Sequence, residues 1–231
     1  MRSEHEQVPA ASVSAAERET RLIEQVACRA EALFAAARGS HDWEHTLRVR
    51  RLSERIGGVE GADLTVVSLA ACLHDIGRSA QDQAGGGVCH ARKGAEMALP
   101  IVADLPLAAE RRDNILHCIR THRYRDGRMP QTLEARVIFD ADKLDAIGAV
   151  GVARAYLFAG EVGAKLHNPD LDPEAAPAYS QEDTGYREYC VKLVKIKARM
   201  LTAEGRRLAA GRHEFMVAFF NRFIQEYKGE R

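Results

Sequence analysis

Residues 63 to 76 constrain the fold most, because they are apolar on nearly every side of a helix. A helix of that kind is buried at the centre of a protein, so other helices must surround it. The stretch ends in His74 and Asp75, and burying such a polar pair costs free energy unless another group engages it. The pattern therefore predicts a central helix that ends in a buried functional site.

Two further helices are predicted before this central one. A capping box begins at Ser14, and apolar residues then recur at helical spacing. Either Ser40 or Asp42 can cap the next helix, which we expect to end at the glycine pair 57–58. This helix carries His45 in line with its apolar residues, so another histidine is expected in the interior.

The rest of the chain also has helical patterning, and no segment alternates as a half-buried strand does. Helices are expected over residues 91–104, 107–121, 132–146, 149–160 and 183–228. Loops are expected over the glycine-rich residues 79–90 and the proline-rich residues 167–185. The predicted fold class is all-α, a single helical bundle with additional C-terminal helices. We expect a flexible tail over 1–13 and one domain over 14–231, with a core at about 22–160 and a helical extension at about 183–228.

Charge and cysteine content exclude several classes of protein. Lysine plus arginine number 33 and aspartate plus glutamate also number 33, so non-specific attraction to nucleic acid or anionic membranes is not expected. The five cysteines form no C-x-x-C pair, which favours free thiols in a reducing compartment. No stretch has the length of a signal-peptide core or a membrane span. We therefore expect a cytoplasmic protein with neither nucleic acid nor membrane partners.

Histidine and carboxylate side chains from separate segments point to a metal site. Imidazole and carboxylate ligands with open water positions suit Mn²⁺, Fe²⁺, Mg²⁺, Co²⁺ or Ni²⁺. Neighbouring residues inside a helix point about 100° apart, so His74 and Asp75 reach one ion only if the helix ends beside them. Gly77 can end it there. Together with His45, these residues need one more ligand.

The segment FDADKLDAIG offers three candidates for that ligand: Asp140, Asp142 and Asp145. In a helix, Asp142 and Asp145 share a face, while Asp140 points elsewhere and pairs more naturally with Lys143. Spacing alone places Asp142 only slightly ahead of the other two.

These motifs, in this order, resemble the HD-domain metal-dependent phosphohydrolase superfamily. Its pattern is a histidine in a first helix, a His-Asp doublet that closes a second, and a distant aspartate in an A-D-[KR]-L context. The matching positions are His45 in HTLRV, His74 and Asp75 in LHDIG, and Asp142 in ADKL. The resemblance covers roughly residues 22–160. It implies a helical bundle in which these four residues bind one divalent metal ion, and hydrolysis of a phosphoester or phosphoanhydride.

Within the superfamily, the segments DADKLDAIGAVGVARAYLFAG and HNPDLDP are similar to the bacterial group related to YpgQ and YedJ. This similarity implies a phosphorylated substrate, a nucleotide, with nucleoside triphosphate pyrophosphohydrolysis as the favoured activity. The expected cofactor is one divalent metal ion, with Mn²⁺ favoured and Mg²⁺, Fe²⁺, Co²⁺ or Ni²⁺ as alternatives. The aromatic residues from Phe215 to Phe223 are expected in the core or at a homodimer interface.

Several residues near the doublet are candidates for catalysis or substrate binding. Asp75 can orient or deprotonate the attacking water. Lys143 can neutralise a transferred phosphoryl group, although a salt bridge to Asp140 explains it equally well. Imidazole and guanidinium groups suited to phosphate contact are those of His90, His122, Arg123 and Arg78.

Other polar residues have simpler explanations. His41 and Asp42 form a second His-Asp pair, and the pair is better explained as a helix start with Asp42 as its cap than as a contact to substrate. His117 is expected to be structural. The remaining arginines of the segment IRTHRYRDGRMP are expected in a solvated loop, although they could also form a phosphate clamp: Arg120, Arg125 and Arg128.

Departures from better-known branches narrow the activity. Nucleotidases and alarmone hydrolases of the superfamily carry H-D-x-x-E, and Arg78 stands at the position of that glutamate. The HD-GYP phosphodiesterases have a second histidine and a G-Y-P element that this chain lacks. No G-x-x-x-x-G-K-[ST] loop occurs, so metal and side chains must hold the phosphates. Cleavage of a cyclic dinucleotide or other phosphodiester, and a non-catalytic nucleotide-sensing module, remain alternatives.

Overall fold

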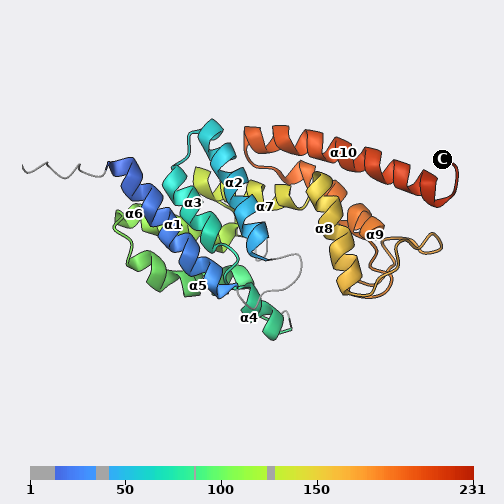
Figure 1. The fold of residues 1–231 in the computed structure, drawn as a ribbon, viewed down its shortest axis with the longest axis horizontal. Helices are drawn as coiled ribbons and strands as arrows, with labels where there is room; N and C mark the ends of the chain where they lie inside the picture. Colours follow the sequence, from blue (N-terminus) through green and yellow to red (C-terminus); the bar gives the residue numbers. More distant parts are fainter. Residues whose placement is uncertain (1–13, 35–41, 86, 124–127) are drawn as a thin grey trace, which may run out of the picture.

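The computed structural model describes residues 14–34, 42–85, 87–123 and 128–231, and every regular element within these ranges is a helix (Figure 1). The all-α prediction is therefore confirmed for the described part of the chain. The predicted tail at 1–13 lies outside the described residues, as do His41 and Arg125.

The apolar stretch forms the predicted central helix, α3 (Leu64–Leu73), in which all residues after Leu64 are buried. Four helices contact and surround it: α1 (Ala15–Leu33), α2 (Trp43–Glu60), α6 (Ala109–Thr121) and α7 (Leu133–Asp145) (Figure 1). The capping box of α1 is also confirmed, because Ser14 and Glu17 each accept a hydrogen bond from the backbone N–H of the other. The central helix thus carries its polar end into the interior of the bundle.

α2 (Trp43–Glu60) begins as predicted and ends later than predicted. Asp42 caps it by accepting a hydrogen bond from the N–H of His45 at 3.0 Å, so the helix-start reading of Asp42 is correct. The expected stop at glycines 57–58 is wrong. Both glycines lie inside the helix, which ends instead at Gly61, where a φ of 79° places the backbone in the left-handed region.

Four helices complete the bundle after α3: α4 (Arg78–Gln83), α5 (His90–Ala103), α6 (Ala109–Thr121) and α7 (Leu133–Asp145). The expected glycine-rich loop is therefore shorter than predicted, because its first residues form α4. The other boundaries lie within a few residues of the predicted ones. α7 contacts α2 and α3, and this packing brings the FDADKLDAIG segment to the end of the central helix.

The C-terminal part lies to one side of this bundle (Figure 1). It comprises α8 (Gly148–Glu161), a long loop, α9 (Gly185–Val191), two short 3-10 turns and α10 (Ala203–Tyr227). Phe220 of α10 is fully buried and stacks on Tyr189 of α9 with a ring-centroid distance of 4.2 Å. The aromatic segment thus contributes to the core as predicted, although Phe215 is 46% exposed.

Asp140 joins α7 to the start of α10. Its carboxylate accepts hydrogen bonds from the backbone N–H groups of Leu201 and Thr202 at 2.8 Å each, and from the Thr202 hydroxyl at 2.7 Å. Because Asp140 is used in this way, the alternative that it pairs with Lys143 is wrong. The C-terminal part is tied to the bundle at this point.

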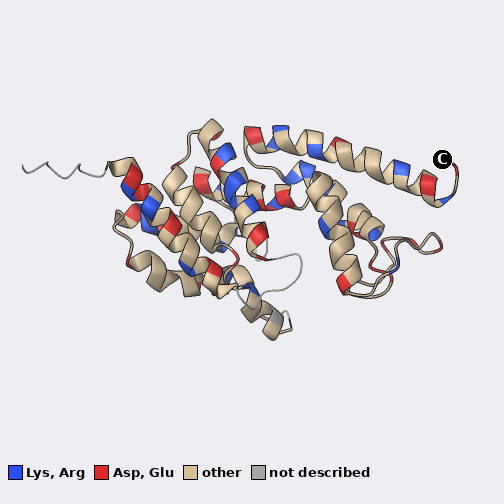
Figure 2. Cartoon of the chain, in the orientation of Figure 1, with Lys and Arg blue, Asp and Glu red and all other residues tan. Residues whose placement is uncertain are grey.

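Both signs of charge are spread along the helices of the bundle and of the C-terminal part (Figure 2). Among the described residues, no helix combines the length and apolar character that crossing a membrane requires.

Candidate metal centre

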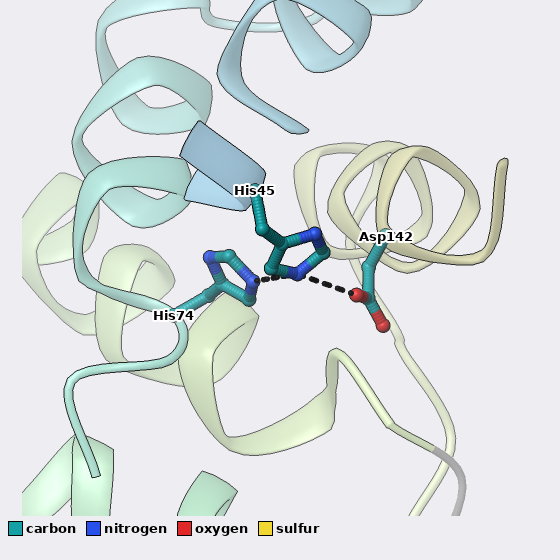
Figure 3. A group of neighbouring side chains, drawn as sticks. All are labelled: His45, His74 and Asp142. Atoms are coloured by element: carbon teal, nitrogen blue, oxygen red, sulfur yellow. Dashed lines mark hydrogen bonds and ion pairs between the residues drawn. The ribbon is translucent and has the colours of Figure 1, made fainter. Parts of the chain in front are cut away.

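Three helices bring two histidines and an aspartate together (Figure 3). His45 comes from the first turn of α2, His74 is the residue that ends α3, and Asp142 lies in the last turns of α7. The Nε2 atom of His45 lies 3.4 Å from the Nε2 atom of His74 and 3.4 Å from Oδ1 of Asp142. Asp142 is therefore the aspartate that joins the two histidines, as spacing and resemblance indicated.

Hydrogen bonds fix how the two imidazole rings are oriented. The Nδ1 atom of His74 donates to the carbonyl of Ala71 at 2.7 Å, and Nδ1 of His45 donates to Oδ2 of Asp145 at 2.7 Å. Both Nε2 atoms then present lone pairs to the same space, an arrangement that needs a proton or a cation between them. The donor set and its orientation fit a divalent metal ion.

Asp75 lies between this group and a second one. Its Oδ2 atom is 3.8 Å from Nε2 of His45 and 3.9 Å from Nε2 of His74. Its Oδ1 atom is 3.2 Å from Nε2 of His90 and 3.6 Å from Nε2 of His122. One carboxylate thus faces two pairs of histidines, so Asp75 lies between the group of His45, His74 and Asp142 and the group of His90 and His122.

The second group consists of Asp75, His90 and His122, all buried, and its ligand atoms are also close enough to hold a metal ion. The Nε2 atoms of His90 and His122 lie 3.1 Å apart. Nδ1 of His122 donates to the carbonyl of Ile119 at 2.7 Å, so its Nε2 atom faces inward with a lone pair. Contact with a phosphate, the role expected from the sequence, requires a proton on this nitrogen, because a phosphate oxygen accepts hydrogen bonds.

Burial keeps several of these histidines neutral, which is the state that binds metal. It lowers the pKa of His74 to about 4 and the pKa of His90 to about 2. Burial also lowers the pKa of His45, but hydrogen bonds to Asp142 and Asp145 outweigh it, and the net shift of that pKa is upward. Burial raises the pKa of Asp142, yet Lys143 and His45 hold it well below its ordinary value.

The predicted cationic residues surround the centre. Nζ of Lys143 lies 2.6 Å from Oδ2 of Asp142, and Nη2 of Arg78 lies 3.3 Å from Oδ2 of Asp75. Nη1 of Arg123 lies 2.9 Å from Nδ1 of His90. His117 is outside this group, where it accepts a hydrogen bond from the backbone of residue 131. Arg78, His90 and His122 therefore lie beside Asp75, and Arg123 lies beside His90.

The sequence analysis missed the role of Asp145, which it treated only as a rival metal ligand. Its carboxylate is buried and binds Nδ1 of His45, while Arg48 and Arg154 each donate to it at 2.8 Å. It therefore orients His45 rather than facing the metal space itself. The i, i+3 spacing from Asp142 shows only that the two share a helix face, and the partners of Asp145 come from α2 and α8.

A cavity of about 670 Å³ opens beside the centre. Part of its wall comes from the residues already described: Arg78, His90, His122, Arg123, Asp142 and Lys143, joined by Gln81. The rest comes from the C-terminal part, which includes Arg154, Phe158, Tyr179, Arg187 and Arg199. None of these C-terminal wall residues was predicted from the sequence, because their contribution depends on how α8 packs against α7 and how α9 packs against α8.

Comparison with known proteins supports the resemblance to the HD-domain superfamily that the sequence motifs indicated. The HD domain family model matches residues 42–147, a range that contains all four candidate ligands. The chain is 31% identical over 228 residues to the protein YpgQ of Bacillus subtilis, which covers 92% of this chain and 97% of YpgQ. The chain belongs to the HD-domain family.

Solved structures of HD proteins share its fold over nearly the whole length. The structure of Bacillus subtilis YpgQ in complex with ADP has 30% identity and a TM-score of 0.68, and the match covers 88% of this chain and 97% of that one. An HD-superfamily hydrolase from Bacillus thuringiensis has 25% identity and a TM-score of 0.72, with coverage of 91% and 98%. As an HD protein with an intact His/Asp cluster, this chain is a metal-dependent hydrolase.

Proposed function

We propose that this HD hydrolase is a nucleoside triphosphate pyrophosphohydrolase that uses one divalent metal ion, with Mn²⁺ favoured. The metal ligands in the proposal are His45, His74, Asp75 and Asp142. The observation that carries it is the grouping of His45, His74 and Asp142, with Asp75 3.8 Å from His45, beside a large cavity lined by cations. Water would attack one phosphorus atom, and the bond between the α- and β-phosphates would break to release a monophosphate and pyrophosphate.

The chain's own residues have distinct roles in this proposal. A divalent metal ion bound there activates water and polarises a phosphoryl oxygen. Asp75 would orient the attacking water, a role supported by its carboxylate, which faces both groups of histidines. Lys143 and Arg78 stand beside ligand carboxylates and can neutralise charge that develops on the phosphates. His90, His122 and Arg123 would contact the phosphates further along the cavity.

The choice of a nucleotide substrate rests on the size of the cavity and on a relative. A cavity of about 670 Å³ is in the range of small-molecule sites and larger than a phosphate group alone requires. YpgQ, which is similar to this chain over most of its length, has been crystallised with ADP. Both observations support a nucleotide, and neither identifies its base or the number of its phosphates.

A substrate screen tests the proposal. Purified protein, stripped of metal and then supplied with Mn²⁺, is incubated with nucleoside mono-, di- and triphosphates, cyclic dinucleotides and a generic phosphodiester. We expect a nucleoside monophosphate and pyrophosphate from the triphosphates. Release of inorganic phosphate would show cleavage elsewhere, and hydrolysis of phosphodiesters alone would overturn the proposed reaction.

Metal analysis of the purified protein tests the number of ions. We expect one ion per chain, whereas two ions would add the group of Asp75, His90 and His122 as a second site.

Two neighbouring aspartates provide a matched pair of variants. Asp142→Ala should abolish metal binding and hydrolysis while the helical circular dichroism spectrum stays that of the wild type. Asp140→Ala should retain metal, because Asp140 binds the start of α10 and does not face the centre. Equal metal content in Asp142→Ala and wild type would show that another aspartate is the ligand.

A further inference from the structure

One face of α8 forms a continuous strip along the cavity. The residues of this helix that line the cavity are spaced by three or four positions, so they share one face: Gly151, Arg154, Ala155, Phe158 and Glu161. Arg154 belongs to the metal centre through its 2.8 Å contact with Asp145. Phe158 is one turn further along, about 6 Å by the helical rise. Its ring therefore lines the part of the cavity beyond the cluster of ligands and cations.

Tyr179, in the long loop before α9, meets Phe158 there. The two rings are edge to face, with centroids 5.8 Å apart and an interplanar angle of 82°. Tyr179 also lines the cavity, yet it is 80% exposed. The tyrosines of α8 and α9 are less exposed: Tyr156, Tyr186 and Tyr189 are half-buried, and each packs against Phe220 of the C-terminal core.

The backbone of Tyr179 is held in a strained conformation. Its φ of 57° lies in the left-handed region, and it is the only non-glycine residue with positive φ among those described. A bulky aromatic residue rarely adopts this conformation, which costs of order 1 kcal/mol or more. The carboxylate of Asp183 stabilises this conformation by accepting a hydrogen bond from the Tyr179 N–H at 2.7 Å. The Nη1 atom of Arg187 donates to the same carboxylate at 2.8 Å.

Strained backbone conformations cluster at ligand-binding sites, and the exposed ring of Tyr179 lines the cavity beside Phe158. We propose that Phe158 and Tyr179 form a stacking platform for the nucleobase of the substrate. This inference rests on the proposed nucleotide function and adds to it. The phosphates would lie beside the metal ligands and cations, and the base would reach the aromatic pair further along α8.

The chemistry of the platform determines its selectivity. Stacking on an aromatic ring accepts any base, because every base has a π-face. The platform therefore distinguishes nucleotides from phosphate chains that carry no nucleoside, and it discriminates weakly among bases. Affinity for a nucleotide should exceed affinity for inorganic pyrophosphate by the contribution of stacking.

Binding measurements with ADP and inorganic pyrophosphate test the platform. With Mn²⁺-loaded protein in a calorimeter, Tyr179→Ala should weaken ADP binding by about 5- to 100-fold and leave pyrophosphate binding unchanged. Tyr179→Phe, which keeps the ring, should bind ADP as the wild type does. The matched control is Leu157→Ala. Leu157 is next to Phe158 in α8, is 53% exposed and does not line the cavity, so this variant should bind ADP as the wild type does.

The outcomes separate this inference from the proposed reaction. Unchanged ADP affinity in Tyr179→Ala, or an equal loss of ADP and pyrophosphate affinity, would overturn the platform even if the wild type hydrolyses triphosphates. Selective loss of ADP binding would support the platform even if the substrate screen finds a different bond cleaved. Phe158→Leu keeps an apolar side chain but removes the ring, and it should lower ADP affinity in the same selective way. Because Phe158 lies in α8, this result would not depend on the folding of the loop that carries Tyr179.

Discussion

At the candidate metal centre, hydrogen bonds from Nδ1 orient the imidazole rings of His45, His74 and His122. His74 and His122 use backbone carbonyls for this, whereas His45 uses the carboxylate of Asp145. A carboxylate partner makes an imidazole a better metal ligand, because it stabilises positive charge on the ring. The same interaction contributes to the upward shift of the His45 pKa. Asp145 should therefore tune the affinity of the centre although it does not contact the metal.

Asp145→Asn tests this role. The amide keeps the size of the side chain but removes the negative charge that His45, Arg48 and Arg154 share. We expect metal affinity to fall by about 10- to 100-fold, measured by competition with a chelator. Asp113→Asn, on the exposed surface of α6, is the control and should bind metal normally. Wild-type affinity in Asp145→Asn would mean that His45 needs no carboxylate partner.

Sequence motifs identified the residues that converge, but not how they are partnered. His45, His74, Asp75 and Asp142 could be selected because their order and spacing match a known pattern, and the structure brings them together. Spacing placed Asp142 only slightly ahead of Asp140 and Asp145, because it shows which face of a helix a side chain is on but not what it meets there. Their partners, the start of α10 and Arg154 of α8, come from segments that only tertiary packing brings near.

At the scale of helices, Gly77 has a different role from the one expected. It does not have a positive φ, so it is not a left-handed helix stop. Its importance lies in the close approach of two backbones. A Cβ atom at Gly77 would lie 2.4 Å from the carbonyl oxygen of His90 and 2.5 Å from the amide nitrogen of Gly94. The turn after α3 can therefore pack against α5 only with glycine at this position.

Gly77→Ala should disturb both stability and the site. Because the clash is with backbone atoms, α5 must shift, and His90 must move with it. We expect a loss of about 1–3 kcal/mol in the free energy of unfolding, measured by urea denaturation. Gly58→Ala is the control, since a Cβ atom there meets nothing within 4 Å. It should be neutral or stabilise α2 by about 0.5–1 kcal/mol. Equal stability of both variants would contradict the close packing.

The positions of most helices follow from the sequence, while their exact ends do not. Cap residues such as Ser14 and Asp42 predict helix starts well, because capping is a local interaction. The glycine pair 57–58 wrongly predicted a helix end. Glycine ends a helix when it adopts the left-handed conformation that other residues avoid, and in α2 Gly61 is the glycine that does so. The helix α4 was missed because it is short and its residues show no clear apolar face.

For the molecule as a whole, the prediction that residues 14–231 form one domain can be tested by unfolding. Phe220 is fully buried in the aromatic core of the C-terminal part, and the single tryptophan, Trp43, lies at the start of α2. Phe220→Ala should cost about 3–5 kcal/mol. In one domain, urea transitions followed by Trp43 fluorescence and by circular dichroism should coincide and shift together. An unchanged Trp43 transition would show that the C-terminal part unfolds separately. Phe215→Ala, at a half-exposed position, is the milder control.

The wall of the cavity is divided between two stretches of the chain. The proposed metal ligands all lie within residues 42–147, the range of the HD family model, whereas Phe158, Tyr179 and Arg199 lie after it. Substitutions in the later stretch can alter the far end of the cavity without touching a single metal ligand. The residues proposed for the reaction and those proposed to hold the base are thus encoded in separate stretches, so exchanging the later stretch between relatives should change substrate preference and leave the proposed metal centre intact.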